Sequence, residues 1–176
     1  SSAVNELFLK LQYNSWNRNS LRLQANSYFG RFYNSGMLEG RIDFPRRLPF
    51  FDKTQFTFNK FNFFKTNTYF FEDEDPYFLI ERDNFFSIMS GFPVTNDGVL
   101  AFDFQIGVNR DEYYQTNNYS RNDTLDQTSF HFFSPGVLLE FNSLNRKEYP
   151  SSGARLAIET HLVFGREEYR PGSTSP

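Results

Sequence analysis

The chain has 176 residues, no cysteine and a formal net charge of −3, and 20% of its residues are aromatic, with 24 phenylalanines and 10 tyrosines. The lack of cysteine excludes disulfides, thiolate metal sites and a cysteine nucleophile. The slight negative charge gives no electrostatic reason to expect nucleic acid as a partner. Phe and Tyr, together with many Asn, Thr and Ser, favour strands and turns over long helices.

Segments of alternating polarity follow one another along the chain, and each is a predicted β-strand with one apolar and one polar face. The clearest example is the run from Leu100 to Asn109, in which apolar residues at even positions alternate with small and polar residues at odd positions. About eight such segments are predicted, near residues 6–13, 21–29, 38–44, 54–59, 86–92, 100–109, 137–142 and 155–164. No convincing helix is predicted, so the chain is expected to be all-β and antiparallel.

The connections between these segments alternate in length. One set contains modest links, at 16–20, 45–53, 93–98 and 144–153, whereas the other set contains two long links, at 65–81 and 109–128, and one short link at 30–36. An antiparallel meander places alternate links at the same rim. Short turns at one rim and long loops at the other are typical of outer-membrane β-barrels.

Two architectures can produce this alternation. A soluble β-sandwich or small barrel buries the apolar faces in a core, whereas a transmembrane barrel turns them to lipid and turns the polar faces to a wet lumen. No segment is apolar on both faces, although a sandwich of this size usually has one. Aromatic residues near segment ends also fit the interfacial girdles of membrane barrels, namely Tyr13, Trp16, Tyr28, Phe29, Tyr113, Tyr114 and Tyr149. The pattern therefore favours the membrane barrel, with the soluble β-sandwich binding module as an alternative.

The most specific motif lies in the turn between the last two segments, where Asn145-Arg146 is followed by Tyr149-Pro150 and Gly153. Pro cannot continue a strand ladder, and Gly tolerates positive φ. This turn resembles the periplasmic strand-turn-strand signature of the bacterial surface-antigen barrel superfamily, which includes outer-membrane insertases and two-partner secretion transporters. Further stretches are similar to the C-terminal barrel of outer-membrane patatin-like phospholipases, at residues 28–33, 71–74, 123–126 and 165–175.

The resemblance implies an antiparallel transmembrane β-barrel in the bacterial outer membrane, with lipid of that membrane as a partner. Barrels of this superfamily have about sixteen strands, so residues 1–176 are expected to be a single barrel region of a larger barrel. Missing parts of the same chain, a partner barrel or further copies would complete it. The lumenal Arg-Gly-aromatic loop, the periplasmic POTRA repeat domains and the patatin Gly-x-Ser-x-Gly nucleophile are not found in the chain.

The function implied by the resemblance is to anchor a periplasmic lipid hydrolase, or to pass lipid or protein into or across the outer membrane. No enzymatic activity is expected within this chain, because the hydrolase residues would lie elsewhere. The alternative from another functional class is a small outer-membrane barrel that adheres or binds ligand at its long loops.

No catalytic, metal or cofactor site is predicted, and the residues that would bind a transported molecule stay unassigned. His161 lies on the polar face of the last segment and is expected to be held by hydrogen bonds. The acidic run at 72–75 lacks the spaced oxygen ligands and Gly of a calcium loop. Acidic residues of the second long link are predicted to be solvated, namely Glu112, Asp123 and Asp126. The aromatic stripe at 56–64 contains little interleaved basic charge, which again argues against nucleic acid.

Overall fold

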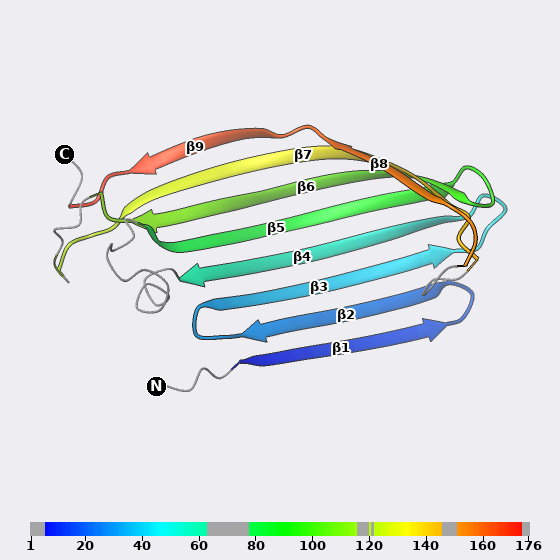
Figure 1. Ribbon diagram of the computed structural model, residues 1–176, viewed down its shortest axis with the longest axis horizontal. Coiled ribbons are helices and arrows are strands. Elements are labelled where there is room, and N and C mark those ends of the chain that lie inside the picture. The colour runs from blue at the N-terminus through cyan, green and yellow to red at the C-terminus, as the bar shows by residue number, and fades with distance from the viewer. Residues whose placement is uncertain (1–5, 63–77, 116–119, 121, 146–150, 174–176) are drawn as a thin grey trace.

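The computed structural model describes residues 6–62, 78–115, 120, 122–145 and 151–173. These residues form a single antiparallel sheet of nine strands and contain no helix, which confirms the predicted all-β class (Figure 1). None of them belongs to a helix with the length and hydropathy needed to cross a membrane. The strands are β1 (Leu7–Trp16), β2 (Ser20–Phe29), β3 (Tyr33–Phe44), β4 (Phe50–Asn62), β5 (Phe78–Pro93), β6 (Gly98–Tyr113), β7 (Asp126–Asn142), β8 (Arg155–His161) and β9 (Phe164–Arg170).

The strands β1 to β8 are ordered in the sheet as they are in the chain, so the fold is a meander. Links after β1, β3, β5 and β7 lie at one end of the sheet, which we call the turn rim (Figure 1). The links after β2, β4 and β6 belong to the opposite end, the loop rim, and two of them, at 63–77 and 114–125, are long. The alternation of links between two rims therefore agrees with the sequence prediction.

The strands at the centre of the sheet are longer than predicted. β5 and β6 have 16 residues each and β7 has 17, because pairing continues past the regular alternation. Residues 109–128 were expected to be a loop, but Asn109 pairs with Phe130 and Tyr113 pairs with Asp126. The prediction was wrong there because these strand ends carry polar residues on both faces, so no period of two marks them.

A ninth strand was not predicted, because the tail after residue 164 is rich in charges. β8 and β9 both pair with β7, and they keep the same register, since Gly136 pairs with His161 and Phe133 pairs with Phe164. This register places Pro135 opposite Leu162, in the gap between the two strands. Proline lacks the N–H that a continuous ladder needs. β8 and β9 are thus two parts of one sheet edge, interrupted by Pro135.

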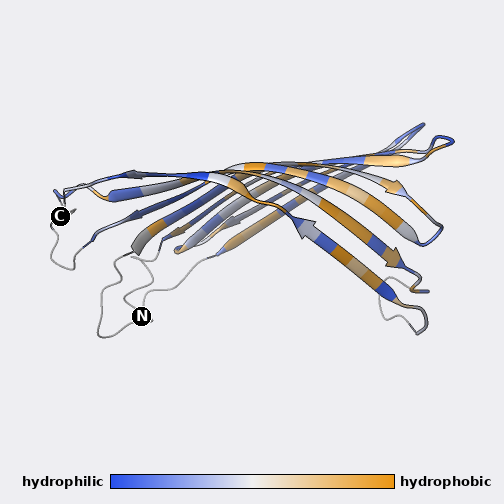
Figure 2. Ribbon diagram, turned by 90° about the horizontal axis from the view of Figure 1, so that it is seen from above, coloured by the Kyte–Doolittle hydropathy of each residue, from blue (hydrophilic) through white to orange (hydrophobic). Residues whose placement is uncertain are grey.

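The sheet curves into an arch, along whose strands hydrophobic and hydrophilic residues alternate (Figure 2). It is not closed: in the described part of the chain β1 pairs only with β2, while β8 and β9 pair only with β7. The predicted barrel is therefore represented by an open sheet with two free edges. The single layer has almost no apolar core, since Ala101 is the only buried apolar residue among those described.

Candidate functional site

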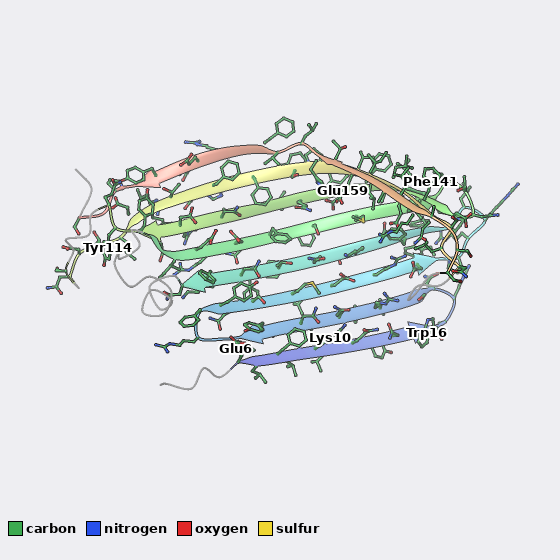
Figure 3. The ribbon with its side chains drawn as sticks, in the orientation of Figure 1. Glu6, Lys10, Trp16, Tyr114, Phe141 and Glu159 are labelled. Carbon is green, nitrogen blue, oxygen red and sulfur yellow. The ribbon has the colours of Figure 1, made fainter. Side chains whose placement is uncertain are left out.

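The registers of the strands sort the side chains into two faces. Neighbouring residues on a strand point to opposite faces, and residues paired across strands share a face. Figure 3 shows the side chains along the strands, with the sheet viewed face on. The apolar face is centred on one row across the sheet, the apolar row: Leu11, Ala25, Leu38, Phe56, Phe86, Ile106, Phe133 and Phe164. The polar face is centred on the next row, the polar row: Gln12, Gln24, Glu39, Gln55, Ser87, Gln105 and Ser134.

Burial on these faces is the reverse of that in a soluble protein. On β6 the side chains of Phe102, Phe104 and Ile106 are 42%, 50% and 54% exposed, whereas Asp103 between them is 4% exposed. In a single curved layer, side chains converge on the concave side and diverge on the convex side. The polar face is therefore the concave face of the arch, and the apolar face is the convex one (Figure 2).

On the apolar face, the apolar side chains form a band of limited length along the strands. On β6 its residues are apolar from Leu100 to Val108, a length of about 26 Å at roughly 3.3 Å per residue. Arg110 follows at the loop rim. Within this apolar band, the carboxylate of Asp52 accepts a hydrogen bond of 2.5 Å from the hydroxyl of Ser90 on the paired strand. This bond pairs the hydroxyl with one oxygen of the carboxylate.

Polar-face charges were expected to pair across strands, namely Arg22, Glu39, Arg41, Glu140, Arg155 and Glu159; among the described residues this holds for Glu39, Glu140 and Arg155, whereas Arg41 and Glu159 pair within their own strands and Arg22 forms no ion pair. The ion pairs are Lys53–Glu39 at 3.1 Å, Arg41–Asp43 at 2.7 Å and Arg155–Glu140 at 2.7 Å. The Arg41 guanidinium also lies 4.0 Å from the centroid of the Phe51 ring. The Lys53–Glu39, Arg155–Glu140 and Arg41–Phe51 contacts join neighbouring strands, whereas Arg41 and Asp43 both belong to β3.

His161 is held by acidic neighbours, as its position in the sequence suggested. Its Nε2 atom lies 2.8 Å from a carboxylate oxygen of Glu159, and its Nδ1 atom lies 3.7 Å from a carboxylate oxygen of Asp103. The ring sits over Gly136, where a Cβ would lie 2.5 Å from it. Gly136 thus leaves the space that this histidine occupies.

Two acidic residues predicted to be solvated are instead structural. Asp126 is completely buried, and one carboxylate oxygen accepts hydrogen bonds from the Tyr169 hydroxyl at 2.6 Å and the Gly172 amide at 2.9 Å. Glu112 forms a two-bond ion pair with Arg82, at 2.7 and 3.2 Å. The prediction was wrong because it placed both residues in a loop, whereas they lie in β6 and β7.

Three carboxylates gather on the polar face at the loop rim, beyond the apolar band. Glu81 pairs directly with Asp111, and Asp83 is two residues further along β5. Burial raises the pKa of Glu81, and the negative charges of Asp83 and Asp111 raise it further. Burial and then Asp83 likewise raise the pKa of Asp111. The carboxylates therefore repel one another at neutral pH.

The turn that carries the family resemblance is partly described. Asn145 organises it, because its side-chain oxygen accepts hydrogen bonds from the amides of Ser151 and Ser152 at 3.1 and 3.2 Å. Gly153 adopts a φ of 98°, the left-handed conformation expected of the motif glycine. The other motif residues, Arg146, Tyr149 and Pro150, lie outside the described residues.

No family model, curated protein or solved structure matches the chain. Within the described ranges, no group of three or more His, Asp or Glu side chains is arranged to hold a metal ion. The resemblance to surface-antigen barrels therefore rests on the turn residues and the matching stretches alone. The two faces of the sheet are the feature from which a function can be argued.

Proposed function

We propose that this chain forms a membrane-spanning part of a β-barrel in the bacterial outer membrane. The observation that carries the proposal is that the apolar row and the polar row lie on opposite faces of the same sheet. Eight strands in succession place an apolar residue on the convex side, and the next position on seven of them is polar and faces the concave side. This arrangement suits a barrel whose convex surface contacts lipid and whose lumen contains water.

Exposure of the apolar face to water would be costly. Covering a side chain the size of Phe or Leu contributes about 1.5–3 kcal/mol, and members of the apolar row such as Leu11, Leu38 and Phe164 are 59–60% exposed. Soluble monomers rarely expose contiguous apolar patches of more than a few hundred Å². A sandwich would cover this face with a second sheet, but all described strands belong to one sheet. Acyl chains are the covering that we propose.

The dimensions of the apolar band support the same environment. Its length on β6, about 26 Å, is close to the roughly 25 Å height of the outward apolar band of outer-membrane barrels. In lipid every backbone polar group needs a partner, so strands span membranes only in closed barrels. The two free edges, at β1 and at β8–β9, must therefore be completed by further strands.

The role within the parent assembly follows from the resemblance to patatin-like phospholipases of the outer membrane. In this proposal the sheet anchors a lipid hydrolase that is carried by other residues, or passes lipid or protein through the completed barrel. The polar row supplies a hydrated concave surface suited to either role.

A pair of single substitutions on adjacent residues tests the proposal. Phe104→Lys places a charge in the middle of the apolar band, whereas Gln105→Lys places the same charge on the polar face. A lysine at mid-membrane on a lipid-facing strand costs about 2–4 kcal/mol. We expect Phe104→Lys to reduce the folded fraction in lipid vesicles sharply and Gln105→Lys to leave it nearly unchanged. A wild-type chain that is monodisperse in detergent-free buffer would contradict the proposal.

A further inference from the structure

Three basic residues form a row at the loop-rim end of the apolar band. Lys60 pairs with Arg82, and Arg82 pairs with Arg110, so all three lie on the apolar face of adjacent strands. We call them the basic row. Paired residues of antiparallel strands have Cβ atoms about 4.5–5.5 Å apart, and like charges placed in this way destabilise a sheet. The row therefore calls for a negative partner.

The described part of the chain supplies only one such partner. Arg82 is paired with Glu112 through hydrogen bonds of 2.7 and 3.2 Å. Neither Lys60 nor Arg110 forms an ion pair with another described residue. In addition, the buried Nε atom of Arg110 has no hydrogen-bond partner among the described residues. Two of the three cations are thus left without an ion pair in this part of the chain, which points to a negative partner outside the described residues.

The position of the basic row defines the chemistry of this partner. Two residues toward the turn rim, the same three strands carry Phe58, Asn84 and Val108, where the apolar band begins. A molecule whose hydrocarbon covers the band would place its head group at the basic row. Arginine binds phosphate oxygens through its planar fork of donors, and long basic side chains reach head groups at a membrane interface.

We propose that Lys60, Arg82 and Arg110 bind the phosphate group of an anionic membrane lipid in the leaflet at the loop rim. The inference rests on the proposed function, because it requires that the apolar face contacts lipid. It adds a specific lipid-binding site and a preference for one leaflet. At the opposite end of the band β4, β5 and β6 carry no row of cations, since their paired residues there are Phe50, Phe92 and Leu100, and Arg46 of the β3–β4 link lies 5.8 Å from the centroid of the Phe44 ring.

The test uses this sheet within its completed barrel, in phosphatidylcholine nanodiscs that contain a titrated fraction of phosphatidic acid, with bound lipid counted by native mass spectrometry. The variant Lys60→Gln/Arg110→Gln removes the two basic residues without an ion pair. Its matched control is Lys10→Gln/Arg22→Gln, which removes one Lys and one Arg from the polar face. A hydrogen bond to a charged group corresponds to roughly a tenfold change in affinity. We expect at least tenfold weaker retention of phosphatidic acid in the first variant and less than a twofold change in the control.

Further outcomes separate this inference from the proposed function. The charge-preserving variant Lys60→Arg/Arg110→Lys should retain phosphatidic acid, which shows that loss of binding does not reflect misfolding. Equal weakening in both Gln variants, or none in either, would overturn the inference. So would displacement of the lipid by millimolar inorganic phosphate, since the site would then bind any phosphate. A completed wild-type barrel that enters the nanodiscs but shows no preference for phosphatidic acid contradicts this inference alone, whereas failure of the completed barrel to enter them contradicts the proposed function.

Discussion

Pro135 lies opposite Leu162 and accepts a hydrogen bond of 3.0 Å from its amide, but it has no N–H to donate in return. This missing donor accounts for the break between β8 and β9. We predict that Pro135→Ala joins them into one strand and slows amide hydrogen exchange at residues 161–164. Stability should change by only about 1 kcal/mol, because the new hydrogen bond is offset by greater freedom of the unfolded chain. Unchanged exchange at these residues would contradict the explanation, and Pro45→Ala at the turn rim is the control.

Asp126 is predicted to fasten the loop-rim end of β7 to β9. Asp126→Ala removes the acceptor for Tyr169 and Gly172, so we expect the free energy of unfolding to fall by about 2–3 kcal/mol. Tyr169→Phe, which leaves the bond to the Gly172 amide in place, should cost less. Denaturant unfolding measures both changes. The exposed Glu167→Ala on β9 is the control and should stay within about 0.5 kcal/mol of wild type. A loss no larger than that of the control would disprove the role of Asp126.

Gly153 is predicted to be required by the turn between β7 and β8. Its φ of 98° is strained for any L-residue with a side chain, and a Cβ there would collide with the carbonyl oxygen of Ser143. Gly153→Ala should therefore lower the unfolding free energy by at least about 1 kcal/mol. Ser152→Ala in the same turn should have little effect. Equal unfolding midpoints for the two variants would show that the turn tolerates a different conformation.

The carboxylates at the loop rim are predicted to make stability depend on pH. The pKa values of Glu81 and Asp111 are raised by burial and by neighbouring carboxylates, so the folded state holds their protons more tightly than the unfolded state does. The contribution of these two groups to the free energy of unfolding is therefore fully present below the ordinary carboxyl pKa near 4. It is lost as the pH rises through their raised pKa values in the folded state. Glu81→Gln should stabilise the sheet at neutral pH and flatten this part of the profile.

Thermal unfolding measured across this pH range tests the prediction. Asp97→Asn makes the same charge change in the exposed turn between β5 and β6, and serves as the control. If Glu81→Gln and Asp97→Asn give parallel profiles, the loop-rim carboxylates do not control the pH dependence.

The sequence was informative where a strand alternates regularly through the apolar band, but not at residues 33–36 of β3 and 50–53 of β4, which were predicted to be links. Where the alternation is regular, one face must be apolar and the other polar, and the resulting period of two located β2 and most of β6 correctly. Outside the band this constraint disappears. The ends of β6 and β7 carry polar residues on both faces and were predicted as loop, although their backbones pair without interruption. The charged strand β9 was missed for the same reason, with the added effect of Pro135.

The features that carry the further inference depend on register, which alternation alone does not reveal. Lys60, Arg82 and Arg110 are far apart in the chain, and only the pairing of β4, β5 and β6 brings them into one row. Asp126 is likewise contacted by Tyr169 of β9, which pairs with Thr128, two residues further along β7. Alternation in the sequence shows on which face a residue lies. The register between strands determines which residues are its neighbours on that face.

The orientation of the two faces can be measured directly, because the chain has no cysteine of its own. Single cysteines at positions 102 to 106 of β6 can carry a spin label in vesicles, and collision with oxygen and with a water-soluble nickel complex reports the surroundings of each label. The account predicts that oxygen dominates at 102, 104 and 106 and that the nickel complex dominates at 103 and 105. Equal access of the nickel complex to both sets, or the opposite alternation, would contradict a lipid-facing convex surface.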